Sequence, residues 1–268
     1  MTSPARARPH GIAAAGRVSA ISVGQAVLEA TSRDFIGRVE GVFGGGFYVS
    51  GPSGTVFAVL GPGCWPGPLH LVTGTMPALP AVHDRVTVSG SELAAGPLRV
   101  RLAGSRHWVP RLPENLDAGP AVWHGIAPGV DAGIASVWET VIGDVRRGDL
   151  APVFDRLQGR GDGLTPSGDD VLAGILLVAA IDRRRRDALA DLALTARTTR
   201  LSRAFLRWAA AGQSIQPAHA LLDAAGSGDQ AGMRRAAASL AGVGATSGRA
   251  LVAGLALAAT ELAPYRLS

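Results

Sequence analysis

The sequence predicts an α+β protein, in which a small antiparallel β barrel or sandwich is followed by an all-α region. Two observations support this class. In the first part of the chain, short β-rich runs alternate with Gly and Pro. In the second part, apolar residues recur at spacings of three and four, as in amphipathic helices. We therefore expect a disordered tail over residues 1–17, a β-rich domain over 18–110 and a helical domain over 111–268.

The β-rich part consists of short runs of β-branched and aromatic residues separated by turn residues. Gly44–Gly46 and Gly51–Gly54 are typical of such turns. The first of these runs lacks the strand-to-helix context of a dinucleotide-binding loop, so we interpret it as a turn. Strands are expected over residues 35–42, 46–50, 55–60, 70–73, 85–89 and 98–102.

The helical part begins with a periodic segment from Gly133 to Arg147, whose last two arginines suit the negative end of a helix dipole. Two later segments are nearly all apolar, and each contains a glycine, Gly174 or Gly254. Their apolar runs are too short to cross a membrane, so we expect two buried, glycine-containing core helices. The helices after Arg147 are expected over residues 149–158, 169–182, 185–198, 201–211, 217–225, 229–241 and 247–262.

The composition excludes several kinds of chemistry. All 26 basic residues are arginine, and no lysine occurs. Schiff-base catalysis, pyridoxal phosphate attachment and the phosphate-binding P-loop all use a lysine, so we expect none of them in its usual form. The net charge of +5 is weak support for nucleic-acid binding because aromatic residues make up only 5% of the chain. We expect no nucleic-acid partner and no cofactor.

Cysteine and histidine usage points to a cytoplasmic protein without a metal centre. Cys64 is the only cysteine, so no intrachain disulfide and no thiolate cluster can form. The six histidines show no zinc-binding spacing, and no nucleophile elbow of a serine hydrolase is present. The first residues lack an uninterrupted apolar run, so we expect no secretory signal and no membrane association.

The stretch Gly163-Leu-Thr-Pro-Ser-Gly-Asp-Asp170 runs into the first apolar helix and carries two adjacent carboxylates. Helix capping explains part of it, with Ser167 as the N-cap, Asp170 completing a capping box and Asp169 stabilised by the helix dipole. Capping leaves Gly163, Thr165 and the spare carboxylate unexplained. A buried carboxylate requires a partner, and an arginine, a metal bridging the pair or the N–H donors of a ligand would each serve.

A second segment, Thr246-Ser-Gly-Arg-Ala-Leu-Val-Ala-Gly254, repeats the scheme of the first before the other apolar helix. In both segments Ser-Gly is followed by Ala-Gly, and the spacing from Gly168 to Gly174 equals that from Gly248 to Gly254. The two helix N-termini are expected to converge on one site, where free N–H groups would receive an anion or a carbonyl oxygen. Coincidence in a chain rich in Ala and Gly is the alternative interpretation.

These two segments resemble a bacterial family, one branch of which is the AllH-type subunit of oxamate carbamoyltransferase, acting in allantoin breakdown. We expect the resemblance to extend over roughly residues 20 to 262. It implies transfer of a carbamoyl group between oxalurate and phosphate, within a hetero-oligomer of several subunits. A Thr-x-x-Ser stretch at Thr199 and Ser202 looks like a further family feature.

The resemblance assigns the candidate site. Asp169 and Asp170 would be catalytic, with one of them accepting an amide N–H or acting as a base. The family's motif places the substrate-binding residues at Gly163, Thr165, Ser167, Gly168, Thr246, Ser247 and Gly248. Backbone N–H groups near the two Ser-Gly pairs would hold an oxygen of the carbamoyl compound or phosphate. The alternative is a non-catalytic scaffold or ligand-sensing subunit in which the first stretch is a structural helix cap.

Overall fold

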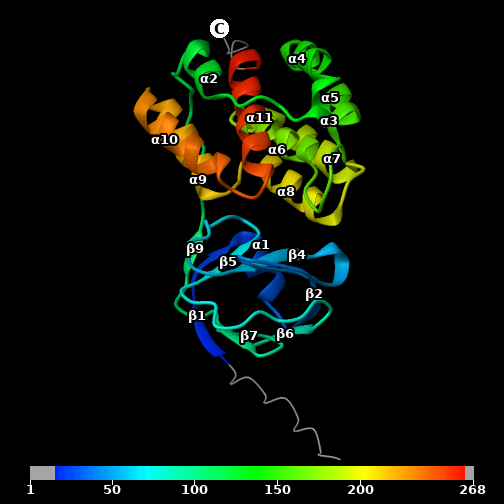
Figure 1. Cartoon of the computed structure of the whole chain (residues 1–268), viewed down its shortest axis with the longest axis vertical. Helices are drawn as coiled ribbons and strands as arrows, with labels where there is room; N and C mark the ends of the chain where they lie inside the picture. Colours follow the sequence, from blue (N-terminus) through cyan, green and yellow to red (C-terminus); the bar gives the residue numbers. More distant parts are fainter. Residues whose placement is uncertain (1–15, 263–268) are drawn as a thin grey trace, which may run out of the picture.

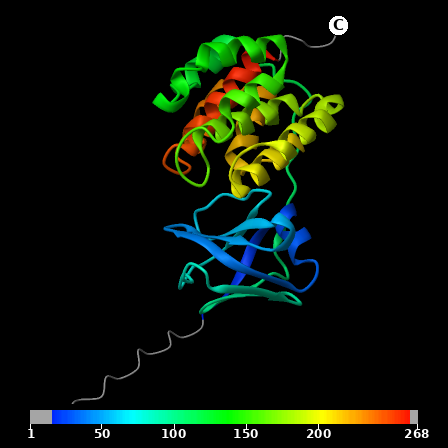
Figure 2. The same cartoon turned by 90° about the vertical axis from the view of Figure 1, so that its right-hand side faces the viewer.

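The computed structural model describes residues 16–262, which form two stacked lobes (Figures 1 and 2). A β lobe comprises residues 16–108, and a helical lobe comprises residues 120–262. Residues 1–15 of the expected disordered tail lie outside the described residues, as do residues 263–268. Gly16 and Arg17 belong to the first strand, so the expectation of a disordered tail is wrong for these two residues.

The β lobe is a closed barrel of eight strands with a ninth strand at its edge. The strand order is β5-β4-β3-β2-β6-β7-β8-β1, and pairing of β1 with β5 closes the ring, while β9 adds to β1. The strands are β1 Gly16–Gly24, β2 Phe35–Phe43, β3 Gly46–Ser50, β4 Val56–Leu60, β5 His70–Thr73, β6 Arg85–Ser89, β7 Glu92–Ala95, β8 Leu98–Arg101 and β9 Arg106–Trp108, with helix α1 at Gln25–Thr31 and the short 3₁₀ helix η1 at Pro52–Gly54.

The expectation of an antiparallel barrel is only partly right. β1 runs parallel to β8 and β9, and β4 runs parallel to β5. The connection over residues 61–69 returns the chain to the starting end of β4, so β5 must run in the same direction. Strands β1, β7 and β9 and helix α1 were not expected. β7 shows the reason, since Glu-Leu-Ala-Ala has little β propensity and its strand is specified by its two neighbours.

Strand β4 is buried along its whole length, unlike β6, in which buried and more exposed residues alternate. Phe57 and Val59 point into the barrel core, whereas Ala58 and Leu60 belong to a separate apolar cluster outside the barrel. A strand buried on both faces needs a second covering layer. The helical lobe covers this outer face at one end of the barrel (Figure 1).

The helical lobe comprises α2 to α11. Its helices are α2 Pro120–Ile126, α3 Ala132–Ala135, α4 Trp138–Arg147, α5 Leu150–Leu157, α6 Ser167–Ala179, α7 Arg186–Thr195, α8 Arg200–Ala210, α9 Gln216–Gly226, α10 Gln230–Ala241 and α11 Ser247–Glu261, with the 3₁₀ helix η2 at Arg183–Arg185. The single helix expected from Gly133 to Arg147 is two helices, because the chain turns at Ser136 and Val137. The arginine run after α6 contributes a C-terminal cap, since Arg186 donates a hydrogen bond to the Ala180 carbonyl at 3.0 Å.

Helices α6 and α11 lie side by side at the centre of the helical lobe and contact each other through glycines (Figure 1). A Cβ atom at Gly174 would lie 2.5 Å from the carbonyl oxygen of Leu251. A Cβ atom at Gly254 would lie 2.1 Å from the carbonyl oxygen of Val171. Each glycine therefore allows the backbone of the other helix to approach it, and the equal spacing of the two sequence segments produces a reciprocal contact.

Hydrogen bonds join the two lobes near α9. The Trp108 indole N–H donates to the Ser214 carbonyl at 3.1 Å, and the Gln216 N–H donates to the Pro66 carbonyl at 2.9 Å. His219 is buried beside them, where its Nε2 accepts from the Ser214 N–H at 3.0 Å and its Nδ1 lies 3.2 Å from the Arg111 carbonyl. Burial lowers the pKa of His219 to about 4, so the imidazole is neutral and Nδ1 carries the donated proton.

The helices of the described chain are all too short or too polar to span a lipid bilayer.

Candidate functional site

The first motif forms the loop before α6, but its capping differs from the expectation. Helix α6 starts at Ser167, and Pro166 takes the N-cap position with φ −52° and ψ 139°. Ser167 is therefore the first helical residue and not the N-cap, and Asp170 does not complete a capping box. The proline ring fixes a φ compatible with a helix start, so the chain begins α6 without a side-chain cap.

Asp169 is buried and its two carboxylate oxygens are occupied within the chain. Oδ1 accepts a hydrogen bond from the Gly159 N–H at 2.8 Å, and Oδ2 accepts from the Thr198 hydroxyl. Burial raises the pKa of Asp169, while these donors and the Ser202 hydroxyl act in the opposite direction. Asp169 thus ties the loop after α5 and the loop before α8 to the start of α6.

Asp170 has a different environment, although it is the next residue. Part of the residue is exposed, but its Oδ2 atom is shielded from solvent and has no hydrogen-bond partner within residues 16–262. Burial raises the pKa of Asp170 from its ordinary value of 3.8 to about 8, the Ser247 hydroxyl opposes this, and the neighbouring Asp169 adds to it. At neutral pH the carboxyl group is therefore mostly protonated and carries an O–H donor.

The arginine partner expected for the paired carboxylates is not seen in the described chain. No arginine within residues 16–262 forms an ion pair with Asp169 or Asp170. In the same part of the chain, no group of three or more His, Cys, Asp and Glu residues could hold a metal ion. Asp169 is satisfied by an amide and hydroxyl groups instead, and Asp170 is accommodated in its neutral form.

The two motif segments meet, as the sequence comparison of the segments predicts. The Thr165 Oγ1 and Ser247 Oγ atoms lie 3.0 Å apart and are hydrogen-bonded. The Thr199 hydroxyl, which caps α8 by accepting from the Ser202 N–H, donates to the Leu164 carbonyl at 2.6 Å. The loop before α6 is therefore held by hydroxyl groups from both α8 and α11.

The backbone amides of Gly168 and Gly248 are already hydrogen-bonded. The Gly168 N–H donates to the Arg160 carbonyl at 2.8 Å, and the Gly248 N–H donates to the Val243 carbonyl at 2.9 Å. Each glycine also permits close packing, since Cβ atoms at positions 168 and 248 would lie 2.1 and 1.8 Å from carbonyl oxygens of Leu157 and Leu240, respectively. These two amides are thus not free to receive a ligand oxygen. Gly163, with φ +88°, shapes an exposed turn.

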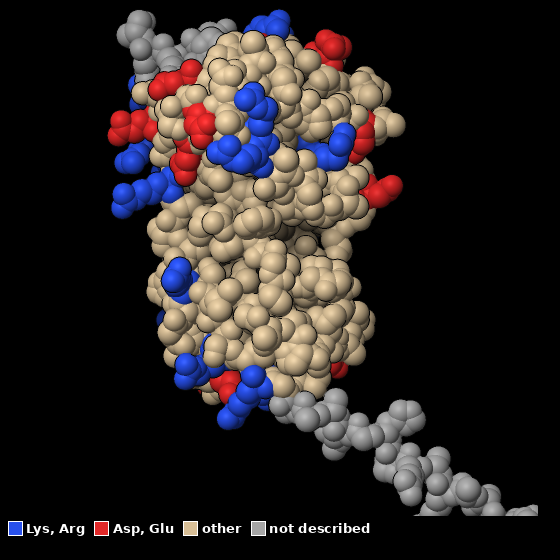
Figure 3. Space-filling model, turned by 60° about the vertical axis from the view of Figure 1, so that its left-hand side comes forward, with Lys and Arg blue, Asp and Glu red and all other residues tan. Residues whose placement is uncertain are grey.

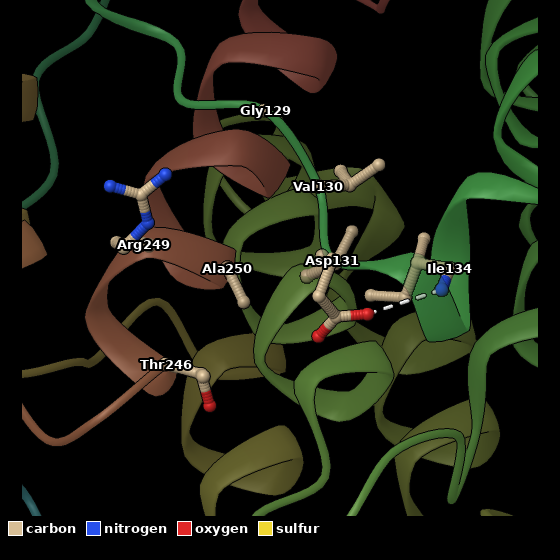
Figure 4. A pocket seen from close by; sticks show the side chains of 8 residues that line it. Gly129, Val130, Asp131, Ile134, Thr246, Arg249 and Ala250 are labelled. Carbon is tan, nitrogen blue, oxygen red and sulfur yellow. Dashed lines mark hydrogen bonds between the residues drawn. The ribbon is translucent and has the colours of Figure 1, made fainter.

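A pocket of about 150 Å³ lies beside the start of α11 (Figure 4). It is close to the carboxylate pair, because Val171, the residue after Asp170, lines it. Thr246 and Arg249 line one side, and Asp131 and Ile134 line the other, while Val171 of α6 contributes to the wall. The Asp131 carboxylate accepts from the Ile134 N–H at 3.1 Å. Arg249 is exposed and has no ion pair or hydrogen bond with the rest of the described chain. Arg249 was not among the expected site residues, although its position directly after Thr246-Ser-Gly could have indicated it.

The β lobe meets this region where Leu164, in the loop before α6, approaches the strands that carry Gly41 and Tyr48. The Leu164 side chain lies 3.5 Å from the position of a Cβ atom at Gly41, which pairs with Tyr48 across β2 and β3. Figure 3 shows a hollow at the junction of the lobes, and the side chains visible around it are uncharged. Sequence reasoning missed Tyr48 because its strand gives no sign of what covers its outer face.

The chain is a two-lobed α+β protein, in which a closed barrel is joined to a helical lobe built around two glycine-packed helices. Thr165, Asp170 and Ser247 form a polar cluster at the start of these two helices. Within that lobe, residues 157–259 match the sequence model of a family described as oxamate carbamoyltransferase subunit AllH. The matched segment contains all nine expected site residues and confirms the resemblance. It covers less than half of the chain and excludes the β lobe, so it is narrower than the expected span. No curated protein and no solved structure matches the chain.

Proposed function

We propose that the chain is a subunit of a carbamoyltransferase-type assembly that handles oxamate, oxalurate or a related small amide in allantoin nitrogen catabolism. The observation that carries this proposal is the match to residues 157–259, which includes Thr165, Asp170 and Ser247 of the polar cluster. The family is described as one subunit of a transferase, so the other subunits would be protein partners of this chain.

The reaction requires proton transfer, which suits Asp170. When oxalurate reacts with phosphate, the bond from the carbamoyl carbon to the amide nitrogen breaks and a bond to a phosphate oxygen forms. The phosphate gives up a proton, and the nitrogen of the released oxamate takes one up. A carboxyl group whose pKa is about 8 is suited to accept and return that proton near neutral pH. Its neutral form also does not repel an anionic substrate.

The Arg249 side of the pocket beside α11, across from the Asp131 carboxylate, is suited to the anionic end of the substrate. Arg249 offers a guanidinium group without an internal partner in the described chain, and such a group pairs well with carboxylate or phosphate. Thr246 adds a hydroxyl group at the same wall. We assign Asp170, Ser247 and Thr165 to the amide end and Thr246 with Arg249 to the anionic end. Asp169 positions α6 and does not contact the substrate.

Calorimetric titration of the full chain with oxamate, oxalurate, carbamoyl phosphate and phosphate tests these assignments. Wild type is expected to bind at least one of them, and Arg249→Ala should weaken binding about tenfold or more. Arg234→Ala, which removes an exposed arginine from α10, is the matched control and should bind as wild type does. If none of the four compounds binds, the ligand assignment is wrong.

Turnover is measured in the reconstituted assembly by phosphate-dependent conversion of oxalurate. Asp170→Asn should lose activity while co-purifying with the other subunits. Full activity of this variant would support the alternative, a scaffold or ligand-sensing subunit. The internal hydrogen bonds of Asp169 favour that alternative in part, because they give one of the two carboxylates its partners within the chain.

A further inference from the structure

The outer face of the barrel presents one tyrosine towards the helical lobe. Phe47 and Val49 of β3 point into the barrel core, whereas Tyr48 packs with Ala58 and Leu60 in the outer apolar cluster. These two neighbours on β4 are buried. Tyr48 is therefore held at the junction of the lobes and not on a free surface of the barrel.

The loop before α6 lies directly over this part of the barrel. Leu164 approaches Gly41 of β2, and Gly41 is the cross-strand partner of Tyr48. Thr165 follows Leu164 and is hydrogen-bonded to Ser247. The Ser247 hydroxyl also lowers the pKa of Asp170, against the effect of burial. Burial raises the pKa of Tyr48, and the charge of the Asp170 carboxylate raises it further.

Two polar groups at this junction lack partners. The Asp170 Oδ2 atom is shielded from solvent and makes no hydrogen bond within residues 16–262. The hydroxyl of Tyr48, a half-buried residue, also makes no hydrogen bond to the rest of the described chain. Buried polar groups are normally hydrogen-bonded, so the unpaired Asp170 oxygen, in the same region as the unpaired Tyr48 hydroxyl, requires an explanation. A ligand oxygen placed between them would satisfy both groups.

We propose that Tyr48 of the β lobe completes the Asp170 site, and that its hydroxyl and the Asp170 carboxyl donate hydrogen bonds to one carbonyl or carboxylate oxygen of a small ligand. This inference rests on the proposed function and extends it, because it places the ligand between the two lobes. A tyrosine and a neutral aspartic acid are a known pair of donors for an oxygen that gains negative charge. The β lobe, which lies outside the matched segment, would then take part directly in the reaction.

Titration of the full chain with oxamate at neutral pH tests the role of Tyr48. Tyr48→Phe keeps the ring and removes the hydroxyl, and it should weaken binding about tenfold to a hundredfold. Thr87→Val, which removes a hydroxyl from β6, is the control and should bind as wild type does. Wild-type affinity in Tyr48→Phe, with weakened binding in Asp170→Asn, would overturn the Tyr48 assignment alone. Absence of oxamate binding by wild type would overturn the proposed use of oxamate as well.

A second measurement does not depend on any ligand. Tyr48 and Tyr265 are the two tyrosines of the chain, so the ultraviolet absorbance of tyrosinate reports on few groups. Comparison with Tyr48→Phe identifies the signal of Tyr48. In Asp170→Asn that signal should titrate at lower pH than in wild type, because the opposing carboxylate charge is gone. An unchanged titration would show that the two side chains do not interact and would overturn the proposal.

Discussion

The hydroxyl oxygens of Thr165 and Ser247 lie 3.0 Å apart and join the loop before α6 to the first residue of α11. This hydrogen bond connects two segments of similar sequence, and Ser247 also opposes the raised pKa of Asp170. The contact therefore affects both the packing of the two central helices and the ionisation of the carboxyl group beside them.

Thr165→Val and Ser247→Ala are each expected to lower the free energy of unfolding by about 1 kcal/mol, since each removes one side of a partly buried hydrogen bond. The double variant should lose less than the sum, because both changes remove the same interaction. Urea denaturation of the four proteins measures this coupling. Ser239→Ala on the exposed side of α10 is the control, and strict additivity would contradict the pairing.

Asp170→Asn is expected to change how stability depends on pH. The pKa of Asp170 is raised in the folded state to about 8, so the folded protein binds this proton more tightly than the unfolded chain. The stability contributed by the proton is fully present below pH 3.8 and is lost as pH rises to about 8. The asparagine variant should therefore exceed wild type by a few kcal/mol above pH 8, and this difference should shrink towards pH 4.

Chemical denaturation at a series of pH values measures that difference. Asp191→Asn, which removes an exposed carboxyl group from α7, controls for the general loss of one negative charge. A constant difference between Asp170→Asn and wild type from pH 4 to pH 9 would mean that Asp170 is not held in its neutral form.

Asp169→Ala should destabilise the fold by about 2–4 kcal/mol, because it leaves the Gly159 N–H and the Thr198 hydroxyl without their acceptor. Asp155→Ala is the matched control, since its ion pair with Arg197 at 3.2 Å is largely exposed and should contribute less than about 1 kcal/mol. Thermal and urea denaturation compare the two variants. Equal losses would contradict a structural role for Asp169.

Gly174→Ala should lower the free energy of unfolding by about 1–3 kcal/mol, although alanine is the better helix former. The added methyl group would lie 2.5 Å from the Leu251 carbonyl oxygen, so α6 and α11 would have to move apart. Gly143→Ala in α4 provides the contrast, because its nearest contact would be the Arg147 side chain at 3.5 Å. That variant should gain about 0.5–1 kcal/mol in the same urea titration. A stabilised Gly174→Ala protein would show that the helices do not touch there.

His219 is expected to make the protein less stable in acid. Its pKa is lowered from 6.5 to about 4 in the folded state, so the unfolded chain binds the proton more tightly between these values. Stability through this residue is present above pH 6.5 and falls by roughly 3 kcal/mol as pH drops to 4. His219→Gln should flatten this part of the pH profile, and His124→Gln on the exposed side of α2 should leave it intact. If the stability of His219→Gln falls with pH as steeply as that of wild type, His219 is not the source of the acid sensitivity.

The sequence was most informative where a pattern is local. Apolar periodicity and turn residues predicted the order of barrel and helices, and the repeated Ser-Gly and Ala-Gly spacing predicted that the N-termini of the two central helices would converge. The N-cap of α6 was predicted incorrectly, because Ser167 and Pro166 are both acceptable at a helix start. The path of the preceding loop determines which of them is the N-cap, and the sequence does not reveal that path. The different roles of Asp169 and Asp170 could not be predicted, since adjacent helical residues face different neighbours.

The sequence by itself determined the fold class, the family resemblance over residues 157–259 and the exclusion of lysine chemistry, because each depends only on residue types and their spacing. Tertiary structure alone decided which carboxyl group is satisfied and which is neutral. It also brought Leu164, in the loop before α6, against Gly41 of β2, the cross-strand partner of Tyr48. Burial and the donors within reach set the ionisation of a carboxyl group, and both arise only when the barrel and the helices pack against each other.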